Sequence, residues 1–303
     1  MSRRRWFVLS IVLAASGCES LFTEPAVDGL AVQVSLTGPS AASANYGDLS
    51  PALRDVRYVH FRFVRADGTR DTIVAGSLES GAFRARVTLR PQEARDWLEI
   101  QAELRMSNEL PLFRGHALVL PSEFSPAASI ELTPVAYSIG APVPAPTITA
   151  LGDTARLGGE ARFANDMRIE GATILWESSN PSIAEVVDGD EIVPRTNGTV
   201  VMIGSSLGAT IQRAVTVRQT PVALTGVGPA DTTVTVGATF RARPFGEDRN
   251  GYPLLPGALV QWWGRGAVTV DANGEVRATA SGTGFVDVSF GPTTHTAQVV
   301  VVP

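Results

Sequence analysis

Residues Trp176–Val186 read WESSNPSIAEV, and this stretch decides the fold because its surroundings recur later in the chain. Ile174-Leu175-Trp176 is echoed by Val260-Gln261-Trp262, and Gly198-Thr199 is echoed by Gly282-Thr283. The two tryptophans lie 86 residues apart and the two glycines 84 residues apart. Offsets this similar indicate an internal repeat. The second half of the chain therefore predicts two tandem units.

The stretch at Trp176 resembles the W-x-S-S-N-x-x-V-A-x-V core of the bacterial Ig-like group 2 family. The resemblance implies two β-sandwich modules, residues 147–219 and 220–303. It further implies that the repeated tryptophan packs between the sheets and that the Gly-Thr pair opens a later strand. The second unit diverges, with Gly264-Arg265-Gly266 where the first has S-S-N-P, so its loop should differ. The structural residues implied are Trp176, Trp262, Gly198 and Gly282.

Residues 29–138 show a strand pattern that matches no family we can name. Val59, Phe61 and Phe63 alternate with polar residues, as does the apolar series from Leu98 to Leu104. Period-two alternation marks strands with one buried face, and seven or so short strands predict a further sandwich. Folding Phe83–Leu104 as a hairpin would set Arg84 opposite Glu103, which explains an arginine stripe as cross-strand ion pairing. Three prolines in residues 139–146 predict an extended linker.

Composition agrees with this all-β class of tandem sandwiches. The 303 residues include 29 glycines and 20 prolines, too many for a coiled coil or helical bundle. The formal net charge is −5, which argues against a nucleic-acid partner.

The N-terminus is typical of an export signal. Arg3, Arg4 and Arg5 precede an apolar run of about ten residues, too short to span a membrane at roughly 20 residues. Small residues then precede Cys18, the single cysteine. The segment resembles a bacterial lipobox, which implies a signal peptide at 1–17, acylation of Cys18 and a tether at 18–28. Acyl chains would hold the protein at a membrane.

No catalytic constellation is evident in the sequence. His60, His116 and His295 are far apart in the chain, and no metalloprotease, hydrolase or phosphate-loop motif occurs. The Asp188/Asp190 and Asp271 segments offer oxygens for calcium, but both fall where hairpin turns favour Asp, Asn and Gly. We therefore expect no enzyme activity, no cofactor and no metal, and interpret the acidic segments as turns.

Two aromatic residues are candidates for ligand contact. Trp263 follows the core-aligned Trp262, so on a strand it must face outwards. Phe285 is expected to face outwards on a neighbouring strand, which would place both aromatics in one exposed patch. The alternative is that a domain or loop covers Trp263.

These features predict a lipid-anchored protein of the cell envelope, at the outer membrane or cell surface rather than the inner membrane. It would act as a non-catalytic adhesion or polysaccharide-binding module, with a polysaccharide or an envelope protein as partner. The alternatives are a structural stalk, an accessory subunit of an envelope complex and, least favoured, a hydrolase within residues 29–138.

Overall fold

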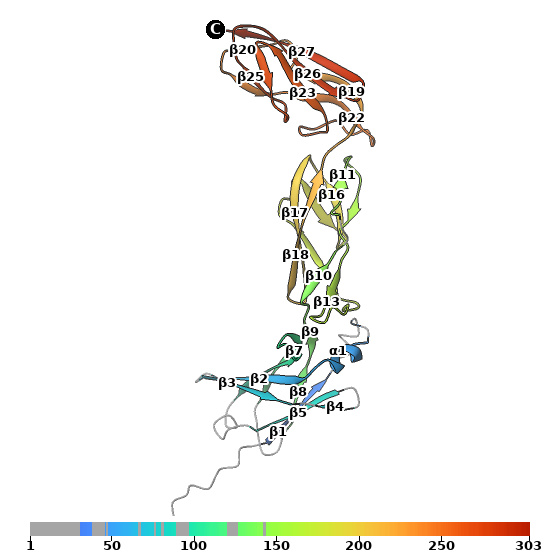
Figure 1. Ribbon diagram of the computed structural model, residues 1–303, viewed down its shortest axis with the longest axis vertical. Helices are drawn as coiled ribbons and strands as arrows, with labels where there is room; N and C mark the ends of the chain where they lie inside the picture. The colour runs from blue at the N-terminus through green and yellow to red at the C-terminus, as the bar shows by residue number, and fades with distance from the viewer. Residues whose placement is uncertain are drawn as a thin grey trace, which may run out of the picture.

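The computed structural model describes residues 31–37, 46, 48–65, 68–75, 77–79, 82–88, 97–119, 127–141 and 144–303. Within these residues the chain is built of strands, with one short helix, α1 (Ser50–Arg54). This confirms the all-β class predicted from the sequence. Figure 1 shows three β bodies in series, with the first sandwich at one end and the C-terminus at the other. None of the described helical residues forms a segment long and apolar enough to cross a membrane.

The first body is a sandwich of two sheets. One sheet has the order β3-β2-β6-β7-β9 and the other β4-β5-β1-β8. Phe61, Phe63, Ile100 and Leu104 are fully buried between them, as the alternation predicted. The strands are β1 (Ala31–Thr37), β2 (Tyr58–Arg65), β3 (Gly68–Val74), β4 (Ser77–Glu79), β5 (Ala82–Thr88), β6 (Leu98–Arg105), β7 (Pro111–Val119), β8 (Ala127–Glu131) and β9 (Thr133–Pro134).

The predicted hairpin between β5 and β6 is wrong. β5 pairs with β1 and β4, whereas β6 pairs with β2 and β7 in the other sheet. Glu103 therefore lies opposite His60 and Arg114, not opposite Arg84. Two consecutive strands that each bury one face can pair with each other or face each other across the core, and periodicity alone does not distinguish these arrangements.

Modules 1 and 2 share one topology of nine strands each. In module 1 the sheets are β10-β13, β11-β18-β17-β14 and β12-β16-β15, and in module 2 they are β19-β22, β20-β27-β26-β23 and β21-β25-β24. The module 1 strands are β10 (Ser138–Gly140), β11 (Thr147–Ile148), β12 (Ala155–Arg156), β13 (Glu160–Arg162), β14 (Leu175–Ser178), β15 (Ala184–Val187), β16 (Glu191–Pro194), β17 (Gly198–Ser206) and β18 (Ala209–Val217). Those of module 2 are β19 (Pro221–Gly228), β20 (Thr232–Thr235), β21 (Thr239–Arg241), β22 (Arg243–Asp248), β23 (Gln261–Gly266), β24 (Val268–Val270), β25 (Glu275–Ala278), β26 (Gly282–Phe290) and β27 (Thr293–Val302).

The structure places the start of module 1 earlier than residue 147. Ser138–Gly140 forms β10 and pairs with β13, the counterpart of β19 with β22 in module 2. The buried Arg213 also donates hydrogen bonds to the carbonyls of Leu157 and Pro144. The predicted linker at 139–146 thus begins inside a strand, because β10 continues to Gly140, before the first of the three prolines.

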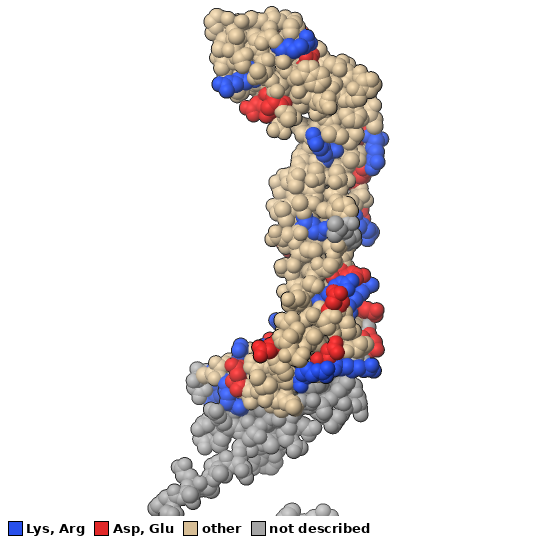
Figure 2. Space-filling view, in the orientation of Figure 1, with Lys and Arg blue, Asp and Glu red and all other residues tan. Residues whose placement is uncertain are grey.

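Both junctions between the bodies are packed. At the first, the rings of Phe113 and Phe163 lie 5.4 Å apart, and Asn165 Nδ2 donates to Asp55 Oδ2 at 2.6 Å. Residues of the first sandwich and of module 1 belong to one continuous buried cluster. At the second, Leu255 of module 2 packs against the core of module 1. The three bodies therefore form a bent column without a loose connection (Figures 1 and 2).

Candidate functional site

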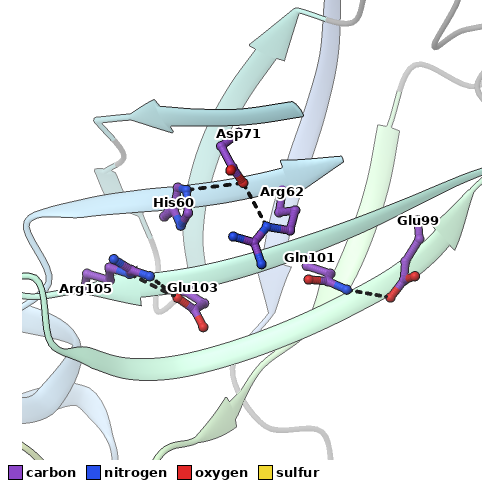
Figure 3. Close-up of polar contacts among 7 residues, drawn as sticks. All are labelled: His60, Arg62, Asp71, Glu99, Gln101, Glu103 and Arg105. Carbon is purple, nitrogen blue, oxygen red and sulfur yellow. Dashed lines mark hydrogen bonds and ion pairs between the residues drawn. The ribbon is translucent and has the colours of Figure 1, made fainter. Parts of the chain in front are cut away.

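A hollow of about 620 Å³ lies over the outer side of the five-stranded sheet in the first sandwich. Because side chains alternate along a strand, the residues between the buried ones of β2, β6 and β7 all point to this side. Figure 3 shows part of this surface, which we call the polar face. Its lining side chains are His60, Arg62, Glu99, Gln101, Glu103, Arg105, Arg114, His116, Glu131 and Thr133.

Strand register sorts the polar face into rows. One row runs Ile73, His60, Glu103, Arg114 and Thr133 across β3, β2, β6, β7 and β9. The next row runs Asp71, Arg62, Gln101 and His116 across the first four of these strands. Apart from Ile73, each row therefore consists of side chains that can donate or accept hydrogen bonds on neighbouring strands.

Asp71 organises one edge of the polar face. Arg62 Nε donates to Asp71 Oδ1 at 2.9 Å, and His60 Nε2 lies 3.5 Å from the same oxygen (Figure 3). The hydrogen bond from Arg62, helped by Coulombic attraction to the same guanidinium, lowers the pKa of Asp71 despite some desolvation. The carboxylate is thus ionised and holds the His60 ring, whose side chain is only 16% exposed.

The middle of the polar face is held by pairs along β6. Arg105 Nη2 lies 2.5 Å from Glu103 Oε2, and Gln101 Nε2 donates to Glu99 Oε1 at 3.0 Å (Figure 3). The hydrogen bond with Glu103 raises the pKa of Arg105 above its usual value. These contacts fix the rotamers of long side chains that would otherwise move freely in solvent.

Arg114 and His116 on β7 are exposed and differ from the rest of the polar face. In the part of the chain that the structure describes, neither side chain has a hydrogen-bond or ion-pair partner, although the Arg114 carbonyl accepts a bond from Thr133 Oγ1. Two large apolar side chains lie beyond them: Leu118 opposite Glu99, and Trp97 two residues before Glu99. Leu118 is 65% exposed and Trp97 61% exposed.

Sequence reasoning missed this convergence because it compared positions along the chain. His60 and His116 lie on one sheet face, separated only by β6, whereas His295 lies in module 2 with Nε2 2.8 Å from the Leu224 carbonyl. The signal available in the sequence was the shared polar side of three alternating strands. Finding it required knowing that β2, β6 and β7 are neighbours.

The polar face combines hydrogen-bond donors with acceptors. Among the described residues, no Ser, Thr or Cys side chain is hydrogen-bonded to His60 or His116, as an activated nucleophile would require. Glu99 and Glu103 are four residues apart on β6, which sets their backbone positions about 13 Å apart along the strand.

Trp263 and Phe285 lie on the paired strands β23 and β26, but diagonally. Trp263 is opposite Asp287, and Arg265 is opposite Phe285. The Arg265 guanidinium carbon is 5.3 Å from the Phe285 ring centre, and its nitrogens bind both oxygens of the buried Asp287 at 2.6 and 2.9 Å. Trp263 is 40% exposed, so the surface here is a tryptophan beside a cation–π and ion-pair cluster.

The implied structural residues take related places in the two modules. Trp176 is buried in module 1 and its ring touches Gly204, whereas Trp262 is half-buried and touches Gly274. Gly198 opens β17 and Gly282 opens β26, with φ of 154° and 135°, a conformation that favours glycine.

The acidic segments serve as turns. Asp271 Oδ1 accepts hydrogen bonds from the backbone N–H groups of Asn273 and Glu275, both at 2.8 Å. Asp188 has a positive φ in the turn between β15 and β16, and Asp190 accepts a bond from Arg156. No cluster of three or more His, Cys, Asp or Glu suited to a metal ion occurs in the described ranges. Cys18, with the signal peptide and tether, lies outside the described residues.

Comparisons with known proteins are limited to solved structures, since neither a family model nor a curated protein matches the chain. Domains 4 and 5 of the S-layer protein SbsC are 17% identical and align 56% of this chain with all of theirs, at a TM-score of 0.25. Invasin, a bacterial integrin-binding protein, is 11% identical, and the alignment covers 90% of this chain and 60% of invasin at a TM-score of 0.33. The four N-terminal Ig domains of Dscam1 isoform 6.44 are 14% identical, and the alignment covers 84% of this chain and 66% of theirs at a TM-score of 0.26. At TM-scores this low, the likeness does not bear on function.

Proposed function

We propose that this protein is a lipid-anchored component of the cell envelope, displayed at the outer membrane or cell surface, that works by binding and not by catalysis. The observation that carries the proposal is the polar face: a solvent-filled hollow over a rigid sheet, lined by hydrogen-bonding side chains held in place by one another. Preorganised groups of this kind lose little conformational freedom when they bind a ligand. Adhesion or polysaccharide binding is the activity that suits such a surface.

The N-terminal sequence supports the anchorage. Loss of the leader with Arg3, Arg4 and Arg5 would change the net charge from −5 to −8, so the mature protein gains no attraction to anionic lipid. Attachment must then come from acyl chains on Cys18. Metabolic labelling with an alkyne fatty acid tests this directly. We expect label on the wild type and none on Cys18→Ser, and an unlabelled wild type would contradict the anchor.

The two packed junctions support a second role, as a stalk or as an accessory subunit of an envelope complex. A column without hinges holds its far module at a set distance from the membrane. Trp263 and Phe285 would then lie in the module farthest from the anchor, where a further ligand contact is proposed. A stalk and a binding protein differ in whether surface substitutions on the polar face affect function.

The deciding experiment uses the soluble form that begins after Cys18. It is applied to purified envelope polysaccharide and to intact cells, and the Arg114→Ala/His116→Ala double variant is compared with Thr69→Ala. Thr69 is an exposed residue of β3 in the same sheet, outside the hollow. Binding that the double variant loses and Thr69→Ala keeps supports the proposal. Equal behaviour of all three proteins favours the stalk.

A further inference from the structure

We propose that the polar face takes a neutral polysaccharide chain lying along β6 and β7, with Trp97 stacking on one sugar ring. This inference rests on the proposed function and names its ligand class. It also assigns a role to Trp97, a residue that the sequence pattern did not single out.

The rows of the polar face match the chemistry of sugar hydroxyls. A hydroxyl group donates one hydrogen bond and accepts others, so a polyhydroxyl chain is recognised by donors and acceptors in alternation. Gln101 and Glu99 offer an amide and a carboxylate on one strand, while His116 and Arg114 offer donors on the next. Gln101 lies directly opposite His116, at the centre of the lining.

Charge favours a neutral chain over an acidic one. The hollow is lined by three arginines and three glutamates. Two of these arginines are committed to carboxylates, Arg62 to Asp71 and Arg105 to Glu103. Capture of an acidic polymer needs an excess of cationic groups, which this surface lacks, and the whole chain carries a net charge of −5.

An apolar platform borders the polar rows at one end. Trp97 directly precedes β6, so strand alternation sets it on the side of Glu99 and Gln101, and it exposes 61% of its surface. Leu118, opposite Glu99, exposes 65%. An indole presents a flat apolar face with a polar N–H, so it is suited to the C–H face of a pyranose ring. With one sugar stacked on Trp97, the next sugars of the chain would lie over Glu99 and Gln101, where their hydroxyl groups meet the polar side chains.

The test measures binding of the soluble chain to defined oligosaccharides. Neutral probes are fragments of glucan, mannan, xylan and chitin, and the acidic probes are polygalacturonate and alginate fragments. We expect a neutral probe to bind with little change between low and high salt. Trp97→Ala should weaken that binding by about tenfold, while Trp97→Phe keeps most of it. Gln101→Ala should also weaken it, and Thr69→Ala should leave it unchanged.

The opposite outcomes are distinct. Binding confined to the acidic probes, with a steep loss in salt, would overturn the neutral chain. Failure of every probe, while the Arg114→Ala/His116→Ala variant still loses cell adhesion, would leave the proposed function in place and point to a protein ligand. If every polar-face variant keeps both oligosaccharide binding and cell adhesion, the neutral-polysaccharide inference and the proposed binding function are both overturned. Circular dichroism of Trp97→Ala shows whether its effect is local, and Gln101→Ala provides a second, independent variant.

Discussion

Gln219 Nε2 donates a hydrogen bond to Asp248 Oδ2 at 2.9 Å across the junction between modules 1 and 2, and both residues are almost completely buried. The same carboxylate oxygen accepts the backbone N–H of Leu151 at 2.8 Å. Gln219 Oε1 in turn accepts bonds from Asn197 Nδ2 and from the Leu255 N–H. Polar groups from both modules are therefore satisfied only when the two modules are docked.

Gln219→Ala should loosen this junction. The change removes the side-chain hydrogen bonds that Gln219 makes with Asp248 Oδ2, the Pro253 carbonyl and the Leu255 N–H across the junction, a loss of about 1–3 kcal/mol. We expect the single unfolding transition of modules 1 and 2 to separate into two in calorimetry. Arg249→Ala is the matched control, because Arg249 pairs with Asp153 at the exposed rim of the same junction. Exposed ion pairs contribute about 0–1 kcal/mol to stability. Equal losses of stability in Gln219→Ala and Arg249→Ala would therefore contradict the view that the buried hydrogen bonds of Gln219 hold the modules together.

Acid should weaken the same junction. Burial acts to raise the pKa of Asp248, but hydrogen bonds from Gln219, Leu151, Asn250 and Tyr252 outweigh it and lower that pKa below its usual value. A carboxylate with a lowered folded-state pKa stabilises the protein above its unfolded pKa of about 3.9, and this stability is lost as the pH falls through the folded pKa. The midpoint temperature of thermal unfolding of the wild type should therefore fall steeply below about pH 4. The difference in unfolding midpoint between the wild type and Asp248→Asn should narrow over the same pH range. A difference that stays constant with pH would exclude stabilisation of the junction by the ionised Asp248 carboxylate.

The three tryptophans of the repeats should differ in stability cost. Trp176→Ala removes a buried ring and should cost about 3–5 kcal/mol, with Trp262→Ala intermediate. Trp263→Ala should cost about 1 kcal/mol or less. Among the described atoms, Trp176 Nε1 is buried without a hydrogen-bond partner, so Trp176→Phe should cost less than about 1.5 kcal/mol. Urea unfolding measures all four variants, and a Trp263→Ala cost equal to that of Trp176→Ala would refute the assignment of core and surface.

Gly115 should tolerate no side chain. A Cβ atom there would overlap the Glu131 carbonyl oxygen and lie 2.7 Å from Ile130, both on β8. Gly115→Ala should therefore destabilise the first sandwich by about 1–3 kcal/mol. Gly140→Ala is the comparison, since its nearest neighbour would be at an ordinary 3.5 Å. Similar unfolding midpoints for the two variants would show that β8 moves away at little cost.

Local pattern predicted much of the fold correctly. Alternation identified the buried side of β2 and β6, because a strand that is half exposed must carry apolar residues at every second position. The resemblance to bacterial Ig-like modules implied that the tryptophan strand and the Gly-Thr strand belong to one sheet, and β23 and β26 do pair. Gly264-Arg265-Gly266 was expected in a loop but belongs to β23, where Arg265 lies opposite Phe285 and pairs with Asp287, a contact that depends on register and not on composition.

The sequence by itself determined many of the strands and their buried faces, since these depend on residues close together in the chain, and the recurrence of the tryptophan and Gly-Thr segments indicated two repeated units. Only the tertiary structure decided which strands are neighbours, and so brought His60, Gln101 and His116 onto one surface. It also decided that the modules lock through Asp248 and Gln219. The physical reason is that side-chain periodicity specifies which face of a strand is buried, whereas pairing and docking depend on contacts between residues distant in sequence.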